Sequence, residues 1–170
     1  MKILQLGFSV PNHLKFPIVS WLVRIVMGWT PYSHIYGRWL VKSIGEWNCF
    51  HATGSGGVHM LGKPEFERTV KPVRIYEMPL EKDEFREVLK FAVHNNGRKY
   101  AHKQNLGIWW AILWGLKENP FSRGKTRQNC SELWGRILAK RGVVFDKSFD
   151  LLTPKDIEDA LIRLKVRRVK

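Results

Sequence analysis

The spacing of apolar residues changes near residue 80 of this 170-residue chain. Before that point, short stretches of β-favouring residues alternate with turn residues, a pattern typical of strands. After it, apolar residues recur three and four positions apart, as they do on one face of a helix. A run of strands followed by a run of helices predicts the α+β class, with a small antiparallel sheet packed against helices.

The expected strands lie in the first half of the chain. They span residues 3–8, 32–41, 46–53, 58–61 and 70–78. A turn at 43–45 joins the second strand to the third as a hairpin, which places His34 and His51 on adjacent strands. An early helix at 14–27, ended by Gly28, separates the first two strands.

The second half carries the other expected helices. They span 80–95 and 104–115, and two more begin at Cys130 and just after Thr153. The 104–115 helix is almost entirely apolar, so it is either buried or offers an apolar surface to a partner, and we expect burial because apolar helices usually belong to cores. The basic segment 120–127 comes just before Cys130 and is expected to form a rim beside it.

Length and composition indicate one globular domain, because 170 residues with 44% hydrophobic content can bury a substantial core. The two cysteines, Cys49 and Cys130, fit no disulfide framework, which favours a reducing compartment. The first residues are too mixed for a signal peptide, and the longest apolar stretch, 106–116, is too short for a membrane span of about 20 residues. We therefore expect a soluble protein that is cytoplasmic in the cell that makes it, or associated with a virion.

The chain is strongly basic, with a formal net charge of +14. Such a charge attracts polyanions, and nucleic acid, anionic lipid headgroups and acidic cell-wall polymers all qualify as partners. Solubility alone would also explain a basic surface. The densest basic cluster, residues 163–170, is expected to be a solvated edge or tail.

Cys130 has the sequence context of a helix start. Asn129 suits the N-cap position, and Glu132 follows three residues later, as in a capping box. A thiol at the positive end of a helix gains acidity, so Cys130 is a candidate thiolate nucleophile. The alternative is that Cys130 is a small core residue.

His34 and His51 are the candidate partners of that thiol. Two histidines on paired strands can form a relay in which His51 orients His34 for the thiol. His59 would compete with His51 if the glycine-rich segment 54–57 folds back, and each histidine alone could be an ordinary strand residue bonded to a neighbour. Zinc would suit these ligand types, but no pair has close metal-motif spacing, so we expect no metal and no cofactor.

Several short motifs follow one another in order along most of the chain. They are Tyr32-Ser33-His34-Ile35-Tyr36, Phe50-His51-Ala52 with Gly56-Gly57-Val58, Gly97-Arg98-Lys99-Tyr100, Asn129-Cys130-Ser131-Glu132-Leu133, Gly142, and Leu152-Thr153-Pro154-Lys155-Asp156-Ile157. In this ordered set the chain resembles the circularly permuted papain-like cysteine hydrolases, the YiiX-like relatives of the NlpC-type cell-wall peptidases and of the lecithin retinol acyltransferase group. The resemblance implies a permuted papain-like (NlpC-like) fold as a single hydrolase domain across residues 1–170.

The resemblance also implies the roles of individual residues. Cys130 would be the nucleophile, His34 the base and His51 the third polar member, with Tyr100 near the oxyanion site and Asn129 in support. The YiiX-like pattern often has an acid at the third position, whereas His51 matches the acyltransferase and NlpC-type arrangement.

The implied reaction is acyl transfer through an acyl-enzyme, as in a thiol protease or amidase. We expect the bond to be an amide of a peptidoglycan stem peptide, since this family is common in bacteria and bacteriophages. The alternatives are a lipid acyl hydrolase or transferase, a catalytically silent structural or virion domain, and a basic nucleic-acid or membrane-surface binder that uses Trp109 and Trp110.

Overall fold

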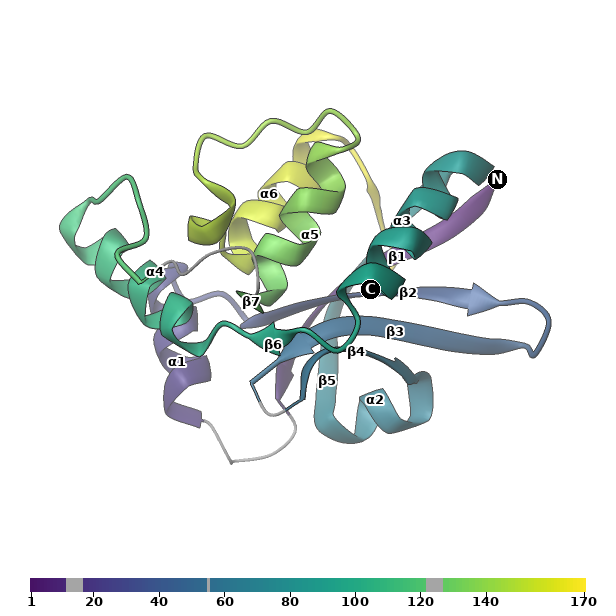
Figure 1. Cartoon of the computed structure of the whole chain (residues 1–170), viewed down its shortest axis with the longest axis horizontal. Coiled ribbons are helices and arrows are strands. Elements are labelled where there is room, and N and C mark those ends of the chain that lie inside the picture. Colours follow the sequence, from purple (N-terminus) through teal and green to yellow (C-terminus); the bar gives the residue numbers. More distant parts are fainter. Residues whose placement is uncertain (12–16, 55, 122–126) are drawn as a thin grey trace.

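Six antiparallel strands form the main sheet of the computed structural model, which describes residues 1–11, 17–54, 56–121 and 127–170 (Figure 1). In spatial order they are β4 (Gly57–Gly62), β3 (Glu46–Thr53), β2 (His34–Val41), β1 (Lys2–Pro11), β5 (Val70–Leu80) and β8 (Arg167–Arg168). The five predicted strands are confirmed, and so is the hairpin of β2 and β3, in which Tyr36 pairs with His51. The α+β class is confirmed, whereas the permuted papain-like fold stays a prediction.

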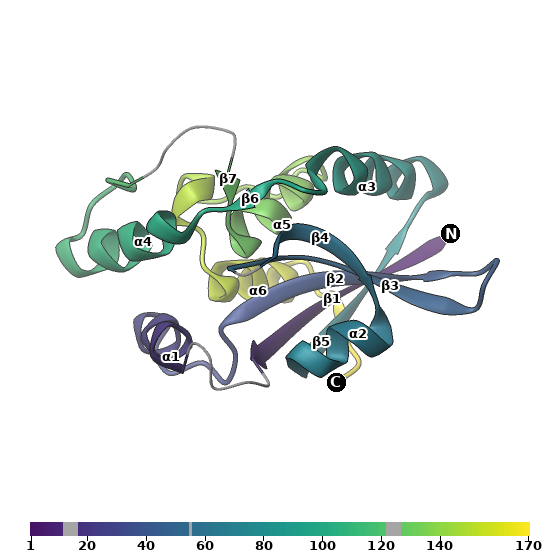
Figure 2. The same cartoon turned by 60° about the horizontal axis from the view of Figure 1, so that its bottom comes forward.

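Helices cover both faces of this sheet (Figure 2). They are α1 (Pro17–Val26), α2 (Lys63–Thr69), α3 (Lys82–Asn95), α4 (His102–Trp114), α5 (Cys130–Ala139) and α6 (Pro154–Arg163), with a 3-10 turn at Phe149–Leu151. A short parallel pair, β6 (Lys99–Tyr100) and β7 (Arg127–Gln128), precedes α4 and α5. The sequence did not predict α2, because this short and mostly charged helix buries a single residue, Phe66.

Alternate residues of β2 face two different cores, as the pleat of a strand requires. Ile35 belongs to the large core that includes Trp134 of α5, whereas Tyr36 belongs to a smaller core on the α2 side. Gly37 has no side chain, and the indole of Trp134 occupies the space where its Cβ would lie. The sheet thereby seats α5, which begins at Cys130.

A buried carboxylate joins α6 to the strands beside the site. Glu158 accepts hydrogen bonds from Tyr32, from Tyr76 at 2.8 Å and from Arg74 at 2.9 Å. Burial by itself would raise the pKa of Glu158, but these three donors outweigh it and hold that pKa below its ordinary value. Tyr32 lies two residues before His34, so this network fixes the start of β2.

The expected burial of α4 is wrong. Of its apolar residues only Ile108 and Ala111 are buried, whereas Leu106, Leu113 and Trp114 are exposed. The reason is its position, because α4 lies with α1 beyond the end of the sheet and packs against α1 and the 3-10 turn (Figure 1).

The basic C-terminal segment forms an edge of the sheet. β8 pairs with Tyr76 and Glu77 of β5, and Arg167 makes an ion pair with Glu77. Of the segment 120–127 expected at the rim, residues 122–126 lie outside the described residues. Within the described ranges, no helix combines the length and the apolarity needed to cross a membrane.

Candidate functional site

Cys130 is the first residue of α5, and Asn129 is the N-cap, as the sequence predicts. The Oδ1 atom of Asn129 accepts a hydrogen bond from the Glu132 amide at 2.7 Å. The expected capping box does not form, because the buried Glu132 carboxylate accepts bonds from Gln104 at 3.0 Å and from Arg136 at 2.7 Å instead. The Asn129 side chain therefore caps the helix, while the Glu132 carboxylate ties the first turn of α5 to Gln104 and Arg136.

The thiol of Cys130 is buried at this helix start. Backbone amides of Ile35, Ser131 and Cys130 itself donate toward the sulfur, and Ser131 Oγ lies 3.9 Å from it. Burial raises the pKa of the thiol, and these donors only partly offset that effect. The position of Cys130 at a helix start predicts a thiolate, but burial keeps the thiol protonated at neutral pH.

Tyr100 and Asn129 both lie beside the sulfur. Burial and the neighbouring Cys130 thiol raise the pKa of Tyr100, whose hydroxyl accepts a bond from Asn105 Nδ2 at 3.0 Å. The bond from the Glu132 amide to Oδ1 fixes the orientation of the Asn129 side-chain amide. Its Nδ2 atom is buried and has no hydrogen-bond partner among the described residues. An unused donor next to a thiol can bind an oxygen atom of a ligand.

A pocket of about 250 Å³ opens beside Cys130, between α1 and α4. Its apolar walls are Leu22, Val23 and Val26 of α1 and Leu106, Ile108 and Trp109 of α4. Tyr100 and Asn129 line the pocket together with the thiol, and none of the described lining residues carries a charge. Apolar walls with a few polar groups at one end are typical of a site for a small apolar ligand.

The structure also pairs the predicted histidines. His34 Nε2 lies 3.3 Å from His51 Nδ1, and the two rings meet edge to face. The rival His59 contacts the His51 ring, but its own Nδ1 lies 3.1 Å from the carbonyl oxygen of Gly57. His51, rather than His59, is therefore the partner of His34.

The thiol group and the histidine pair adjoin at the peptide between His34 and Ile35. The His51 ring contacts Phe66 on the α2 side of the sheet, whereas α5 with Cys130 covers the opposite side. Among the described residues, the interactions of the sulfur include the Ile35 amide and do not include the His34 ring. The five predicted site residues therefore form two groups. Cys130, Tyr100 and Asn129 line the pocket, whereas His34 and His51 pair on the α2 side of the sheet.

Both histidines of the pair are neutral at pH 7. Burial, with a smaller contribution from the charge of His59, lowers the pKa of His34 to about 4. Burial also lowers the pKa of His51, and its histidine neighbours lower it further. A neutral imidazole has a lone pair that can accept a proton, and the lowered pKa makes His34 a weaker base than an exposed histidine.

We expect the protein to lose stability as the pH falls from about 6.5 toward 4. The unfolded chain binds protons at His34 and His51 near pH 6.5, whereas the folded state keeps both neutral, so acid favours unfolding. Each histidine contributes at most about 1.4 kcal/mol per pH unit to this loss in free energy of unfolding. Urea unfolding at pH 7.5 and pH 5.0 measures it.

His51→Gln should unfold with a shallower pH dependence than the parent protein. His94→Gln, at an exposed position of α3, is the matched control and should keep the parental dependence. Identical pH dependences for the parent and His51→Gln would contradict the assignment of a buried neutral histidine pair.

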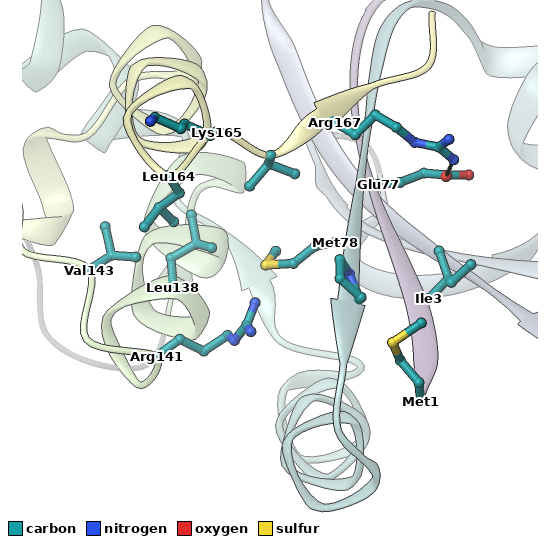
Figure 3. Close-up of a pocket in the computed structure, with 12 residues that line it drawn as sticks. Met1, Ile3, Glu77, Met78, Leu138, Arg141, Val143, Leu164, Lys165 and Arg167 are labelled. Carbon is teal, nitrogen blue, oxygen red and sulfur yellow. Dashed lines mark hydrogen bonds and ion pairs between the residues drawn. The ribbon is translucent and has the colours of Figure 1, made fainter.

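A second hollow, of about 600 Å³, lies between α5, the C-terminal segment and the strands β1 and β5 (Figure 3). Met78 and Leu138 contribute apolar surface, and the cations at its rim include Arg141 and Arg167. Both arginines are already paired, Arg141 with Glu84 at 3.1 Å and Arg167 with Glu77. The described lining residues of this hollow include no cysteine or histidine.

Comparison of the sequence with protein-family models found no match, and comparison with curated proteins found none either. The family resemblance therefore stays a prediction. Within the described ranges, no three His, Cys, Asp or Glu side chains are grouped so that they could hold a metal ion.

Proposed function

We propose that the protein is a cysteine-dependent hydrolase or transferase of acyl bonds, with Cys130 as the nucleophile. The observation that carries this proposal is at Asn129, which lines the Cys130 pocket and whose buried Nδ2 atom has no hydrogen-bond partner among the described residues. Leaving such a donor unpaired costs about 1–3 kcal/mol. A carbonyl oxygen of a bound acyl group would satisfy it, and the carbonyl carbon would then lie beside the sulfur.

The proposed first step forms a bond between the Cys130 sulfur and the carbonyl carbon while the thiol proton passes to His34. The carbonyl oxygen gains negative charge and accepts hydrogen bonds from Asn129 Nδ2 and from the amides at the start of α5. The bond from the carbonyl carbon to the leaving oxygen or nitrogen then breaks, and the leaving group takes the proton from His34. Water, or another acceptor, releases the acyl group from sulfur by the same proton transfers in reverse and restores the thiol.

His34 is the proposed base because the family resemblance gives it that role and because its backbone adjoins the Ile35 amide that donates to the sulfur, although its ring lies with His51 on the α2 side. The step requires the His34 ring to turn toward the sulfur while the other ring nitrogen stays near His51. Since burial raises the pKa of the thiol and lowers that of His34, the pair starts uncharged. His34 therefore acts as a general base during attack, without a resting thiolate–imidazolium pair.

The pocket favours an apolar acyl group, which makes a lipid acyl ester or amide the first candidate substrate. The described residues of its walls are mostly apolar and uncharged, whereas a stem peptide presents carboxylate and ammonium groups that would need charged partners. A peptidoglycan stem-peptide amide is the second candidate. The net charge of +14 and the basic segment 120–127 favour this anionic substrate.

We expect kcat/KM for p-nitrophenyl esters to rise with acyl chain length until the pocket is full. Each methylene that leaves water contributes about 0.8 kcal/mol, equivalent to roughly a fourfold gain per carbon. The assay compares acetyl to dodecanoyl esters with stem-peptide amides, and the rate of the Cys130→Ala variant is subtracted throughout. Equal rates for all chain lengths would contradict an apolar acyl substrate.

Release of peptide fragments from stem peptides, without ester turnover, would assign the second candidate substrate. Absence of Cys130-dependent turnover on both substrate classes would contradict the proposed chemistry and leave a structural or binding domain.

A further inference from the structure

Large apolar side chains are exposed on the two neighbouring helices α1 and α4 and just after α1. Trp29 is 64% exposed, Trp114 is 66% exposed and Leu106 is 58% exposed, and Trp21 and Trp110 are also exposed. The rings of Trp21 and Trp29 lie 6.2 Å apart, and those of Trp110 and Trp114 lie 5.9 Å apart. We call these residues, with Leu113, the α1–α4 surface. Soluble proteins rarely expose so many large apolar side chains together unless they bind something there.

Basic residues predominate along the segments that carry this surface. Residues 1–45 and 88–117, which contain both helices, include no aspartate or glutamate. Lys103 is exposed in the first turn of α4, Lys117 is exposed three residues after its end beside Glu118, and Arg24 lies in the last turn of α1. Tryptophan and leucine side chains flanked by cations, on a chain with net charge +14, are the features that bind a bilayer surface containing anionic lipid.

From these observations we infer that the α1–α4 surface docks on membranes that contain anionic lipid, with its tryptophans at the headgroup level. Tryptophan is enriched at the membrane–water interface because its ring is apolar and its N–H is polar. The aliphatic members, Leu106 and Leu113, suit acyl chains, whereas nucleic acid would stack on aromatic rings and gain little from leucine. A second copy of the chain would bring another 14 positive charges and no acidic partner in these helices.

Docking in this orientation would connect the membrane with the Cys130 pocket. α1 and α4 supply both the exposed residues and the apolar pocket walls, and Leu106 belongs to both. A lipid acyl group could then pass from the bilayer to the thiol without crossing water. This connection rests on the proposed function, whereas membrane binding itself does not depend on the chemistry of Cys130.

The test is sedimentation of the protein with vesicles of phosphatidylcholine alone and of phosphatidylcholine with 30% phosphatidylglycerol. The full chain carries Cys130→Ala throughout, so that no turnover can alter the lipid and a failure to bind stays separate from a failure of the chemistry. We expect binding to the anionic vesicles and at least tenfold weaker binding to the neutral ones. Trp110→Ser with Trp114→Ser should weaken anionic-vesicle binding by at least about tenfold, because two large side chains no longer leave water.

Val93→Ser with Val144→Ser is the matched control, since both residues are exposed and neither lies on α1 or α4. This variant should bind as the parent does, and circular dichroism checks that both variants fold. Binding that survives the Trp110 and Trp114 changes, or equal weak binding to both vesicle types, would overturn the inference. Two other results would also overturn it. In each, vesicle binding is absent, and the Trp110 and Trp114 changes abolish either dimerisation in solution or binding to a single-stranded oligonucleotide.

Discussion

Cys130→Ala is expected to lower kcat by about 10⁴-fold or more on whichever acyl substrate the parent protein turns over. Alanine has no group that can form a covalent bond to the carbonyl carbon, so only binding and the Asn129 Nδ2 donor would remain to assist water. The change removes only the sulfur atom at this buried position, so it should disturb the fold little. Steady-state kinetics with both proteins at equal concentration measures the loss.

Cys49→Ala is the matched control for this experiment. Cys49 is the other free cysteine, and it lies buried in the small core on the α2 side of the sheet. Its variant should keep the parental kcat, and mass spectrometry of the parent during turnover should find the acyl adduct on Cys130 alone. Comparable rates for the parent and Cys130→Ala, or an acyl adduct on another residue, would rule out Cys130 as the nucleophile.

Gly37→Ala is expected to lower the free energy of unfolding by about 3 kcal/mol, the upper part of the range for an overpacked core. A Cβ at residue 37 would lie 2.0 Å from the Trp134 ring, far inside contact distance. Trp134 is fully buried and cannot move aside without shifting α5. Urea unfolding measures the change, and because α5 also carries Cys130, acyl turnover should fall with it.

A double-mutant cycle with Trp134→Phe tests the cause of this loss. The atoms nearest to the added Cβ belong to the outer part of the indole, which phenylalanine lacks, so Gly37→Ala should cost less in that background. Gly62→Ala is the matched control in the same sheet, since its Cβ would meet its nearest neighbour at 3.8 Å. If Gly37→Ala costs no more than Gly62→Ala, the close packing of α5 on β2 is not what holds the helix.

Local patterns sufficed to predict most strands and helices. The turn at 43–45 and the β-favouring residues on both sides of it predicted the hairpin of β2 and β3, because both signals act within a few residues. The N-cap role of Asn129 was equally local, since a cap depends on one side chain and the next three amides. The absence of acidic residues from 1–45 is visible in the sequence as well.

Other features depend on contacts between distant residues. The burial predicted for α4 was wrong. An apolar sequence indicates that a helix is more stable in apolar surroundings, but only the fold determines whether other elements cover it. Glu132 matched a capping box, yet its carboxylate bonds to Gln104 and Arg136 once it is buried. The protonated state of the Cys130 thiol likewise follows from burial, which outweighs the amides at the helix start.

The sequence by itself determined the types of chemical group available to this protein and the short elements that carry them, including a thiol at a helix start and two histidines on paired strands. Only the tertiary structure decided that His51 rather than His59 bonds to His34, that Asn129 Nδ2 has no partner among the described residues, and that the pocket at Cys130 is mostly apolar. The physical reason is that burial and hydrogen-bond partnership are set by residues far apart in the chain. Ionisation and ligand preference depend on both of these, so they follow from the packed fold.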